Sequence, residues 1–394
     1  MAFKRDQTPG ADIQRFLGMP AKRRELIAAA PDTLPVAEYG VNRLARALHP
    51  GTMRAKVVEK ALVATDCWKI TLESLRDDGR FPYFRAGQFT ALSARVGDSF
   101  LTRPYSIVSS PRAALAGVLE IIVQRKSGGI FSAWLIDEAE IGTELAVSEP
   151  AGDFHHDDLR DRGHVLAIAG GSGVTPFLSM AKAICEGSED FHLTLVVGAR
   201  TRAHLCFDVA EFDGAAEGRI RVVPVLSEEE VSGMRHGFIT ADVLAEFLGE
   251  GRAEDASVFM CGPDAMYAFV GAELAKLGFP EARIRRERNA VGNRPVGEQA
   301  TYNLTVHIRD AVCTIPARND ETLATAMERA GIAAPVRCKN GSCGFCHSRL
   351  VAGECCVEAE NDFRRAADRK FGFIHPCCTY PLSDVEIDVP IFEA

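Results

Sequence analysis

Seven of the twelve cysteines of the chain lie close together near its C-terminal end. Three of them, Cys338, Cys343 and Cys346, have the spacing C-x4-C-x2-C in the segment CKNGSCGFC. Thiolate sulfur is a soft anionic donor of the kind that holds iron and bridging sulfide. Two glycines within the segment give its backbone freedom to turn tightly and to approach the sulfides. The spacing is typical of a loop that binds a [2Fe–2S] cluster and takes its fourth ligand from a later position.

The fourth ligand is expected in IHPCCTYPLSDVEIDV, where Cys377 and Cys378 are adjacent. Neighbouring strand residues point to opposite faces, so only one of the two can reach the cluster. Zinc is the weaker interpretation, because it favours paired C-x2-C units and the chain has a single such pair. Cys355 and Cys356 are interpreted as ordinary thiols. Four further cysteines are interpreted as small core residues, namely Cys67, Cys185, Cys206 and Cys313.

The segment TRPYSIVSSP has residues that suit a flavin. Arg103 offers a bidentate clamp for a phosphate. Tyr105 lies two residues further on, and therefore on the same face of a strand, where an aromatic ring can stack on a flavin. Ser106 can hydrogen-bond a ring nitrogen. Each of these residues alone is equally compatible with an ordinary strand of a barrel.

A second segment, KSGGIFSAWL, follows at residues 126–135. Two glycines open what is predicted to be a short helix. The N–H groups and the dipole at such a helix start form an anion site suited to a pyrophosphate. The hydroxyl of Ser132 could add a donor.

A nucleotide site is predicted from LAIAGGSGVTP at residues 166–176, which has the pattern of a strand, a glycine turn and a helix start. This arrangement brings backbone amides and a helix dipole onto a pyrophosphate. Cys261, Gly262 and Pro263 follow a later predicted strand, where ligands of α/β sheets bind. Arg200 and Arg202 end the second strand of this region and could hold a phosphate or the adenine end of a dinucleotide.

The pattern of predicted strands and helices that position these motifs changes along the chain. Short strand patterns separated by turns at 53–61, 68–73, 87–94, 103–109 and 119–124 predict a small antiparallel barrel. Strands at 164–169, 193–197, 222–226 and 258–261 alternate with helices at 177–186 and 264–277, which predicts a parallel doubly wound sheet. The predicted domains are residues 51–157, 158–289 and 301–394, with a polar linker at 290–300. Residues 1–50 are interpreted as an N-terminal extension with predicted helices at 22–30 and 41–48.

These motifs, in this order, resemble the ferredoxin–NADP reductase superfamily of flavin reductases with a C-terminal plant-type ferredoxin domain, over roughly residues 51–394. The resemblance implies a β-barrel flavin domain, an α/β nucleotide domain and an α+β β-grasp-like ferredoxin domain. Plant-type ferredoxin domains end with a ligand Cys, three residues and then Pro-x-Ser-Asp-Val, which makes Cys377 the fourth ligand. The segment Glu149–Gly152 matches the segment that closes the family's barrel.

The resemblance also implies roles for individual residues. Cys261 would lie beside the nicotinamide carbon that gives up hydride, Thr175 near the nicotinamide, and Glu287 near the flavin. This sequence departs from the family's E-x-F pattern, because Asn289 stands where relatives have Phe. Ser106, Cys261 and Glu287 are the candidate catalytic residues. The implied flavin contacts are Arg103, Pro104, Tyr105, Ser106, Gly129, Ile130, Phe131 and Ser132. The implied nucleotide contacts are Gly170, Gly171, Gly173, Val174, Thr175, Pro176, Arg200, Arg202, Cys261, Gly262 and Pro263.

The implied function is an NAD(P)H-dependent electron-transfer reductase. Reduced nicotinamide gives two electrons as hydride, flavin accepts both and releases them singly, and the cluster carries one. FAD is favoured over FMN because GGIFSAWL is more similar to the FAD type, and NADH is favoured over NADPH. The expected partner is a redox protein such as an oxygenase, demethylase, desaturase or hybrid cluster protein. The alternatives are reduction of a free small molecule, or a subunit of a fixed redox complex with little NAD(P)H chemistry of its own.

Composition agrees with an ordinary globular protein: 47% of the 394 residues are hydrophobic and 25% are charged. The net charge of −9 argues against a nucleic-acid binder. Residues 1–60 carry a net charge of +5, so the N-terminal extension is expected to aid docking or packing. The chain has no apolar run long enough for a membrane span, and no signal segment is recognised. Together with the many thiols, this leads us to expect a cytoplasmic protein.

Overall fold

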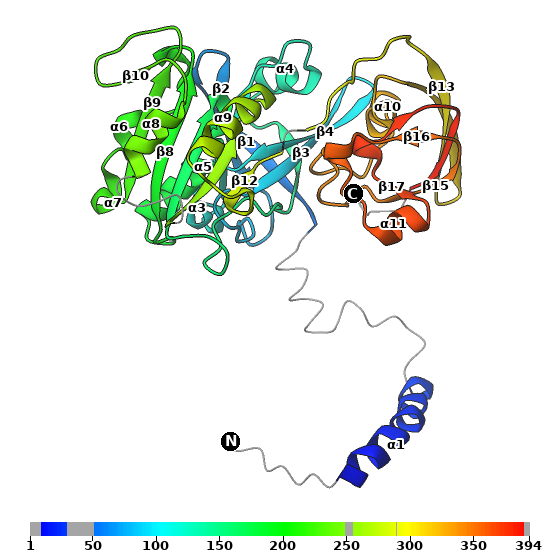
Figure 1. Cartoon of the computed structure of the whole chain (residues 1–394). Coiled ribbons are helices and arrows are strands. Elements are labelled where there is room, and N and C mark those ends of the chain that lie inside the picture. The colour runs from blue at the N-terminus through cyan, green and yellow to red at the C-terminus, as the bar shows by residue number, and fades with distance from the viewer. Residues whose placement is uncertain (1–8, 30–50, 249–254, 289, 390–394) are drawn as a thin grey trace. The chain divides into compact units, whose positions relative to one another are not determined.

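The computed structural model describes residues 9–29, 51–248, 255–288 and 290–389 (Figure 1). The chain divides into two units, Met1–His49 and Pro50–Ala394. In the first unit, helix α1 (Pro9–Ala28) begins well before the helix predicted around Lys22. The second helix predicted in the extension, at 41–48, lies outside the described residues. Among the helices of the described residues, none has the length and apolar character needed to span a membrane.

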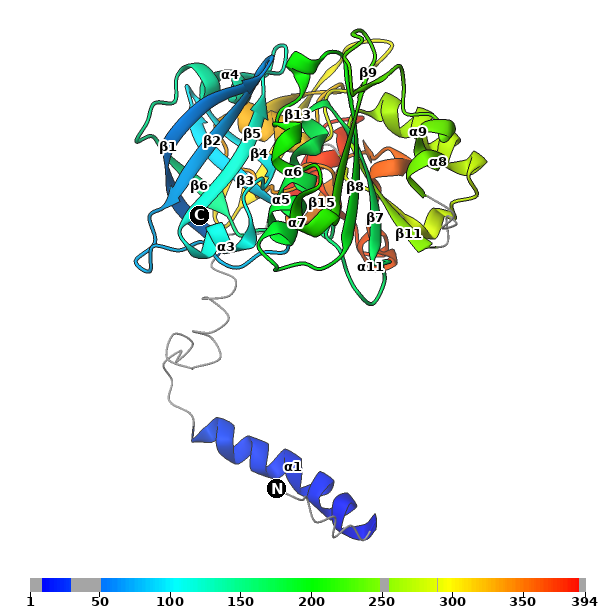
Figure 2. The same cartoon turned by 90° about the vertical axis from the view of Figure 1, so that its left-hand side faces the viewer.

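The second unit begins with a six-stranded antiparallel barrel, which confirms the predicted fold of this region (Figure 2). Its strand order is β4-β3-β6-β1-β2-β5, and a bridge between Ile107 and Ile121 joins the two ends of the sheet. The short strand β6 was not predicted, because five residues carry too little alternation to stand out. The strands are β1 (Thr52–Ala64), β2 (Cys67–Ser74), β3 (Phe89–Val96), β4 (Ser99–Ser106), β5 (Val118–Gln124) and β6 (Glu144–Ser148); the helices are α3 (Pro111–Leu115) and α4 (Ile130–Asp137).

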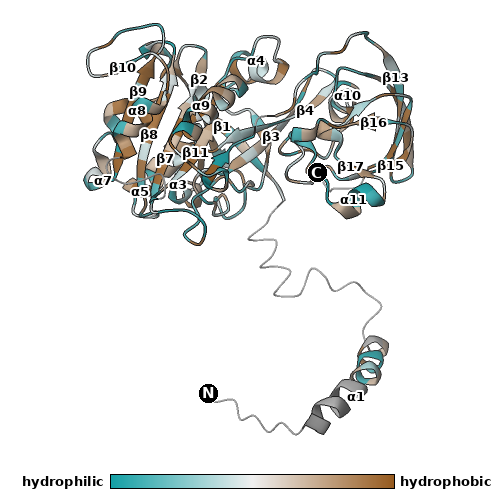
Figure 3. Cartoon of the chain, viewed as in Figure 1, coloured by the Kyte–Doolittle hydropathy of each residue, from teal (hydrophilic) through white to brown (hydrophobic). Residues whose placement is uncertain are grey.

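A parallel sheet of order β10-β9-β8-β7-β11-β12 follows, as predicted. Its central strands are buried on both faces and form hydrophobic bands in Figure 3. Strand order reverses at β7, which pairs with β8 on one side and β11 on the other, and ligands of such sheets bind at this point. The strands are β7 (His164–Gly170), β8 (His192–Ala199), β9 (Ile220–Leu226), β10 (Arg235–His236), β11 (Ala256–Cys261) and β12 (Ile284–Arg286); the main helices are α5 (Thr175–Cys185), α8 (Ala241–Leu248) and α9 (Asp264–Lys276).

The C-terminal region forms a mixed sheet of order β14-β13-β19-β15-β17 that packs against helix α10 (Leu323–Arg329). A small two-stranded sheet, β16 with β18, lies beside the cysteine-rich segments. Cys185 and Cys313 are exposed, so the prediction that they are core residues is wrong. The strands are β13 (Thr301–Ile308), β14 (Ala311–Arg318), β15 (Ser348–Ala352), β16 (Cys355–Cys356), β17 (Phe373–Ile374), β18 (Tyr380–Pro381) and β19 (Val385–Asp388), with helix α11 (Ala366–Lys370).

The segment predicted as a linker is attached to this C-terminal region along its first residues. The backbone N–H of Val291 donates to Lys339 O at 2.7 Å, and the hydroxyl of Tyr380 donates to Gly292 O at 2.8 Å. The guanidinium of Arg294 lies 4.8 Å above the Tyr380 ring. Residues 291–294 therefore pack as part of the C-terminal region.

Candidate electron-transfer site

Strand β4 presents the residues expected to hold the flavin. Arg103, Tyr105 and Ser106 are each half-buried on this strand, which pairs with β3 in the register Leu92 to Arg103. Burial raises the pKa of the Tyr105 hydroxyl, so the ring is a neutral aromatic surface. Its centroid lies 6.3 Å from that of Phe131 in helix α4, which brings the two predicted flavin segments together.

The N-terminus of α4 has the form of an anion site. Gly129 is the N-cap residue and provides no side-chain cap, so the first N–H groups of the helix are not satisfied by a capping side chain. Ser132 Oγ donates to Gly129 O at 3.2 Å and accepts from Lys126 N at 3.3 Å, which closes the turn before the helix. Phe131 is buried in the barrel core, whereas Ile130 is 62% exposed. This uncapped helix start fits a flavin phosphate.

The two predicted nucleotide motifs lie directly against each other at the carboxyl ends of β7 and β11. A Cβ atom built on Gly173 would lie 2.1 Å from Cys261 O, and one on Gly170 would lie 2.9 Å from Pro263 Cδ. Only glycine permits this approach. The hydroxyl of Thr175 donates to Ser172 O at 3.0 Å and closes the loop. The glycine loop and the CGP segment thus form one surface, on which backbone N–H groups and the start of α5 can hold a pyrophosphate.

This nucleotide surface also contacts the barrel. Ser172 Oγ donates to Gln124 Oε1 at the end of β5, over 2.8 Å. The side chain of Cys261 is buried, and burial together with the nearby Glu287 raises the pKa of its thiol. Cys261 is therefore a neutral thiol between the glycine loop and Glu287.

Tyr267, in the first turn of α9, was not predicted from the sequence. Its hydroxyl accepts a hydrogen bond from Gly262 N at 3.2 Å and donates to Glu287 O. Burial raises the pKa of the Glu287 carboxyl to about 8. Tyr267 therefore joins the CGP segment to Glu287. Its place four residues after Pro263, on the first turn of a helix, is the signal that could have identified it. Asn289 lies outside the described residues.

Arg200 and Arg202 are exposed and follow the end of strand β8 at Ala199. The side chain of Arg200 contacts His204 Nε2 at 2.8 Å. The backbone N–H of Arg202 donates to the carboxylate of Glu229 at 2.7 Å. The acidic run 228–230 therefore lies beside the two arginines and lowers the positive potential available to a phosphate.

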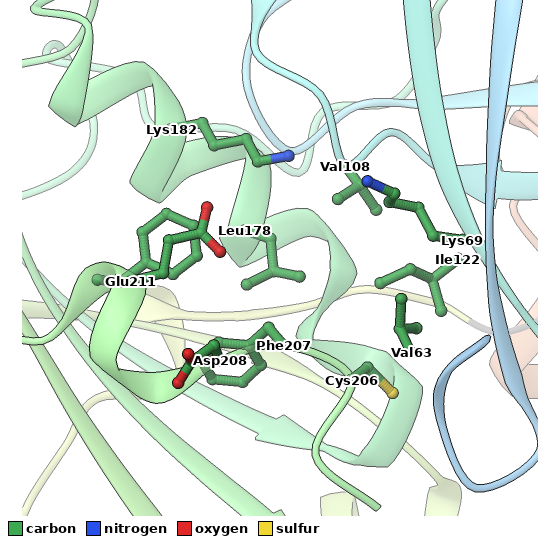
Figure 4. Close-up of a pocket in the computed structure, with 11 residues that line it drawn as sticks. Val63, Lys69, Val108, Ile122, Leu178, Lys182, Cys206, Phe207, Asp208 and Glu211 are labelled. Carbon is green, nitrogen blue, oxygen red and sulfur yellow. The ribbon is translucent and has the colours of Figure 1, made fainter. Parts of the chain in front are cut away.

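A cavity of about 260 Å³ lies between the barrel and the parallel sheet (Figure 4). Lys69 and Lys182 reach its rim, and both pair with Glu120, at 3.2 and 2.7 Å. Cys206 and Asp208 line the opposite side in Figure 4. None of the predicted flavin or nucleotide contacts lines this cavity, so it is separate from the proposed cofactor sites.

The four predicted cluster ligands come together in the C-terminal region. The Cys338 thiol lies within hydrogen-bonding contact of Cys343 and Cys377, and Cys377 also contacts Cys346. Within the described residues, no three His, Cys, Asp or Glu side chains are arranged as ligands of a single metal ion. The donor set is four neighbouring thiols, which fits a [2Fe–2S] cluster.

Cys377 and Cys378 lie in a short 3-10 helix, Pro376–Cys378, and not in a strand as assumed from the sequence. Successive side chains of such a helix still point in different directions. Cys378 Sγ donates to Asn361 O and His375 O, both at 3.5 Å, and also contacts Cys377, whereas Cys377 contacts the candidate ligands Cys338 and Cys346 as well. This geometry supports Cys377 as the fourth ligand.

The cysteine loop lies against the flavin strand. Glu328 of α10 accepts hydrogen bonds from Thr102 N and from Arg103 Nη1 of strand β4, and from Lys339 Nζ of the loop. A second ion pair, of 2.7 Å, joins Arg337 to Glu149 Oε1 at the barrel edge. Figure 1 shows α10 beside β4. Of the residues on either side of Cys338, Arg337 thus contacts the barrel directly, and Lys339 is linked to it through Glu328.

A flavin strand, a dinucleotide loop and a group of four neighbouring thiols in one compact unit define an electron-transfer oxidoreductase. Three family models match the chain: an oxidoreductase FAD-binding domain over residues 54–156, an oxidoreductase NAD-binding domain over 167–271 and a 2Fe–2S iron–sulfur cluster binding domain over 306–382.

Curated relatives extend this result. The chain is 32% identical to the ferredoxin reductase component of 3-ketosteroid-9-alpha-monooxygenase from Rhodococcus rhodochrous, over 79% of this chain and 88% of the relative. It is 31% identical to one component of 1,2-phenylacetyl-CoA epoxidase from Escherichia coli K12, over 77% and 88%. The solved structure of phthalate dioxygenase reductase superposes with a TM-score of 0.61 at 23% identity, covering 87% of this chain and 98% of that chain, and shows the same fold.

The chain belongs to the family of NAD(P)H-dependent flavin reductases that carry FAD-binding, NAD-binding and 2Fe–2S domains. The predicted fold class, cofactors and enzyme class are thereby confirmed, including FAD. The family's chemistry is transfer of electrons from a nicotinamide, through flavin, to the cluster and onward to a redox partner.

Proposed function

We propose that the chain is the NADH-dependent reductase component of an oxygenase-type system, and that it delivers single electrons from its cluster to a separate protein. The observation that carries the proposal is the contact between the flavin strand and the cluster loop through Arg103, Glu328 and Lys339. Intramolecular electron transfer requires the flavin and the cluster to lie close together, and this contact holds the segments expected to bind them side by side. The two relatives described above, which are named as components of a monooxygenase and an epoxidase, support an oxygenase as the partner.

NADH is the proposed donor because of the charges near the end of β8. A 2′-phosphate needs a positively charged pocket, whereas the 2′-hydroxyl of NADH does not. Glu229 accepts a hydrogen bond from Arg202 N, and this carboxylate would repel the additional phosphate of NADPH. The acidic neighbours therefore favour the uncharged ribose.

The proposed catalytic residues are Ser106, Cys261 and Glu287. Ser106 would orient the flavin from strand β4, and the buried neutral thiol of Cys261 would contact the nicotinamide without adding charge. The half-buried Glu287 retains a proton at neutral pH, because its pKa is about 8. When bound, FAD accepts hydride and releases electrons singly to the cluster.

The proposed cluster ligands are Cys338, Cys343, Cys346 and Cys377. The other implied flavin and nucleotide contacts stay part of the proposal, as do the domain boundaries at 51–157, 158–289 and 301–394. A reducing compartment, and hence the cytoplasm, is proposed because none of the twelve cysteines forms a disulfide.

Anaerobic titration of the purified holoprotein with NADH, and separately with NADPH, tests the proposal. Absorbance follows the flavin, and low-temperature paramagnetic resonance follows the cluster. We expect NADH at stoichiometric amounts to bleach the flavin and to produce a one-electron [2Fe–2S] signal, and NADPH to do so far more slowly. A holoprotein that stays oxidised with both nucleotides would instead be a subunit that receives electrons from elsewhere.

A further inference from the structure

Glu328, through which the flavin strand and the cluster loop are linked, is a buried carboxylate. It is 1% exposed and lies on α10, between the barrel and the cysteine loop. Oε1 accepts from Thr102 N at 3.2 Å and from Arg103 Nη1 at 3.1 Å, and Oε2 accepts from Arg103 Nη1 at 3.0 Å and from Lys339 Nζ at 2.7 Å. A buried carboxylate is stable only when it is paired in this way.

Lys339 ties this carboxylate to the predicted cluster ligands. It directly follows Cys338 in the sequence, it is 3% exposed, and its backbone has the unusual φ of +55° for a non-glycine residue. An L-residue adopts this conformation at a cost, so the surroundings must hold it in place. The bond from Nζ to Glu328 is one such restraint.

Arg103 ties the same carboxylate to the flavin site. All three bonds that it makes here, to Glu328 and to Thr102 O, come from Nη1. A guanidinium has five N–H donors in a planar fork, so it can hold Glu328 from one corner and a flavin phosphate from another. Glu328 therefore contacts one residue expected to bind flavin and one adjacent to a cluster ligand.

The charges of these three side chains do not cancel. Arg103 and Lys339 both pair with the single carboxylate of Glu328, and of these two basic side chains Lys339 is the buried one, at 4% exposure against 31% for Arg103. A cluster held by four thiolates is negatively charged, and reduction adds one more negative charge. In a low-dielectric environment, a nearby positive charge favours the reduced cluster.

We infer that Glu328 is a positioning residue for electron transfer within the chain. It fastens the cluster loop to the flavin strand, and together with Arg103 and Lys339 it sets the electrostatic field at the cluster. This inference rests on the proposed function, since it assumes that electrons pass from the flavin to the cluster.

The test is a redox titration of the cluster in holoprotein variants, followed by paramagnetic resonance, with iron and sulfide content confirming a loaded cluster. Glu328→Gln removes a negative charge, so we expect the cluster potential to rise. Lys339→Met removes a positive charge, so we expect it to fall. At a fixed solution potential, each variant should change the ratio of reduced to oxidised cluster about threefold or more, in opposite directions. Lys339→Arg keeps the positive charge, so its cluster potential should equal that of the unmodified chain.

Glu321→Gln is the matched control. Glu321 is also a fully buried carboxylate of the C-terminal region, and it pairs with Arg329 at 2.6 Å and with Arg318 at 3.4 Å. Unlike Lys339, neither arginine is adjacent to a predicted cluster ligand in the sequence. We expect this variant to be less stable but to keep the cluster potential.

Shifts in the same direction for Glu328→Gln and Lys339→Met, or no shift in either, would overturn the inference. If Lys339→Met fails to hold a cluster, the sign of the shift in Glu328→Gln alone decides. In the unmodified chain, reduction of the cluster by NADH is measured in the same titration. Failure of that step counts against the proposed function, whereas unchanged potentials with intact reduction count against the inference alone.

Discussion

The carbonyl oxygen of Cys261 lies so close to the α-carbon of Gly173 that a Cβ atom there would come within 2.1 Å of it. We therefore expect Gly173→Ala to push the glycine loop away from the end of β11. Because this loop is proposed to hold the pyrophosphate of NADH, KM for NADH should rise about tenfold or more, and kcat should fall because hydride transfer depends on geometry at the ångström scale. Steady-state reduction of ferricyanide checks this result.

The control for this change lies in the same loop. Ser172→Ala removes one hydrogen bond to Gln124, of 2.8 Å, and introduces no clash. We expect a far smaller change in KM and the same FAD content in both variants. Equal kinetics for Gly173→Ala and the unmodified chain would show that the loop is free to move from the strand.

Cys377 and Cys378 should respond differently to replacement by serine. We expect Cys377→Ser to lose or shift the [2Fe–2S] paramagnetic resonance signal, because its thiol contacts Cys338 and Cys346. Cys378→Ser should keep the signal, because that thiol donates to backbone oxygens at 3.5 Å. The reverse pattern would assign the fourth ligand to Cys378.

The buried ion pair between Arg285 and Asp161 should contribute strongly to stability. Its atoms lie 2.6 Å apart, with side chains 7% and 4% exposed. Asp161→Asn leaves a buried guanidinium without its counter-charge, which should lower the free energy of unfolding by about 3–5 kcal/mol. Urea unfolding measures this difference. The exposed pair of Arg235 with Glu246 is the control, where Glu246→Ala should cost about 1 kcal/mol or less.

Glu287 should make stability depend on pH. Its pKa rises from 4.5 to about 8 on folding, because burial disfavours the charged form. Between these values the folded chain holds a proton that the unfolded chain has released, so the free energy of unfolding falls as pH rises through this window. Glu287→Gln lacks this titration, and its stability relative to the unmodified chain should increase from pH 5 to pH 9. Urea midpoints at pH 5, 7 and 9 check the trend, and a constant difference would place the pKa of Glu287 near its ordinary value.

The parts of the fold that the sequence predicts are those with a local cause. Alternating apolar residues mark β1 to β5, and glycine turns followed by apolar runs mark β7 and α5, because periodicity and turn chemistry act within a few residues. The short strand β6 lacks such a signal. The 3-10 helix at Cys377 was missed because a proline and two cysteines are compatible with either backbone form.

The residues of the site likewise fall into those that have a local sequence signal and those that do not. Spacing within a loop identifies Cys338, Cys343 and Cys346 as a group. The contacts of Tyr267 with Glu287 and of Glu328 with Arg103 join residues that are 20 and 225 positions apart. Nothing local in the sequence encodes such pairs, because their proximity results from how whole elements pack.

The hydrogen bonds of Val291 and Gly292 to the C-terminal region change what this connection can do mechanically. A flexible tether has slack, and its reach grows with the number of residues in it. Here the first part of the connection is fastened next to the cysteine loop itself. Adding glycines at 295–299 would therefore extend a surface loop without lengthening the connection between the nucleotide domain and the C-terminal region. Any rotation of the iron–sulfur domain relative to the nucleotide domain must therefore take place upstream of Val291. Only a few residues there can change their backbone conformation.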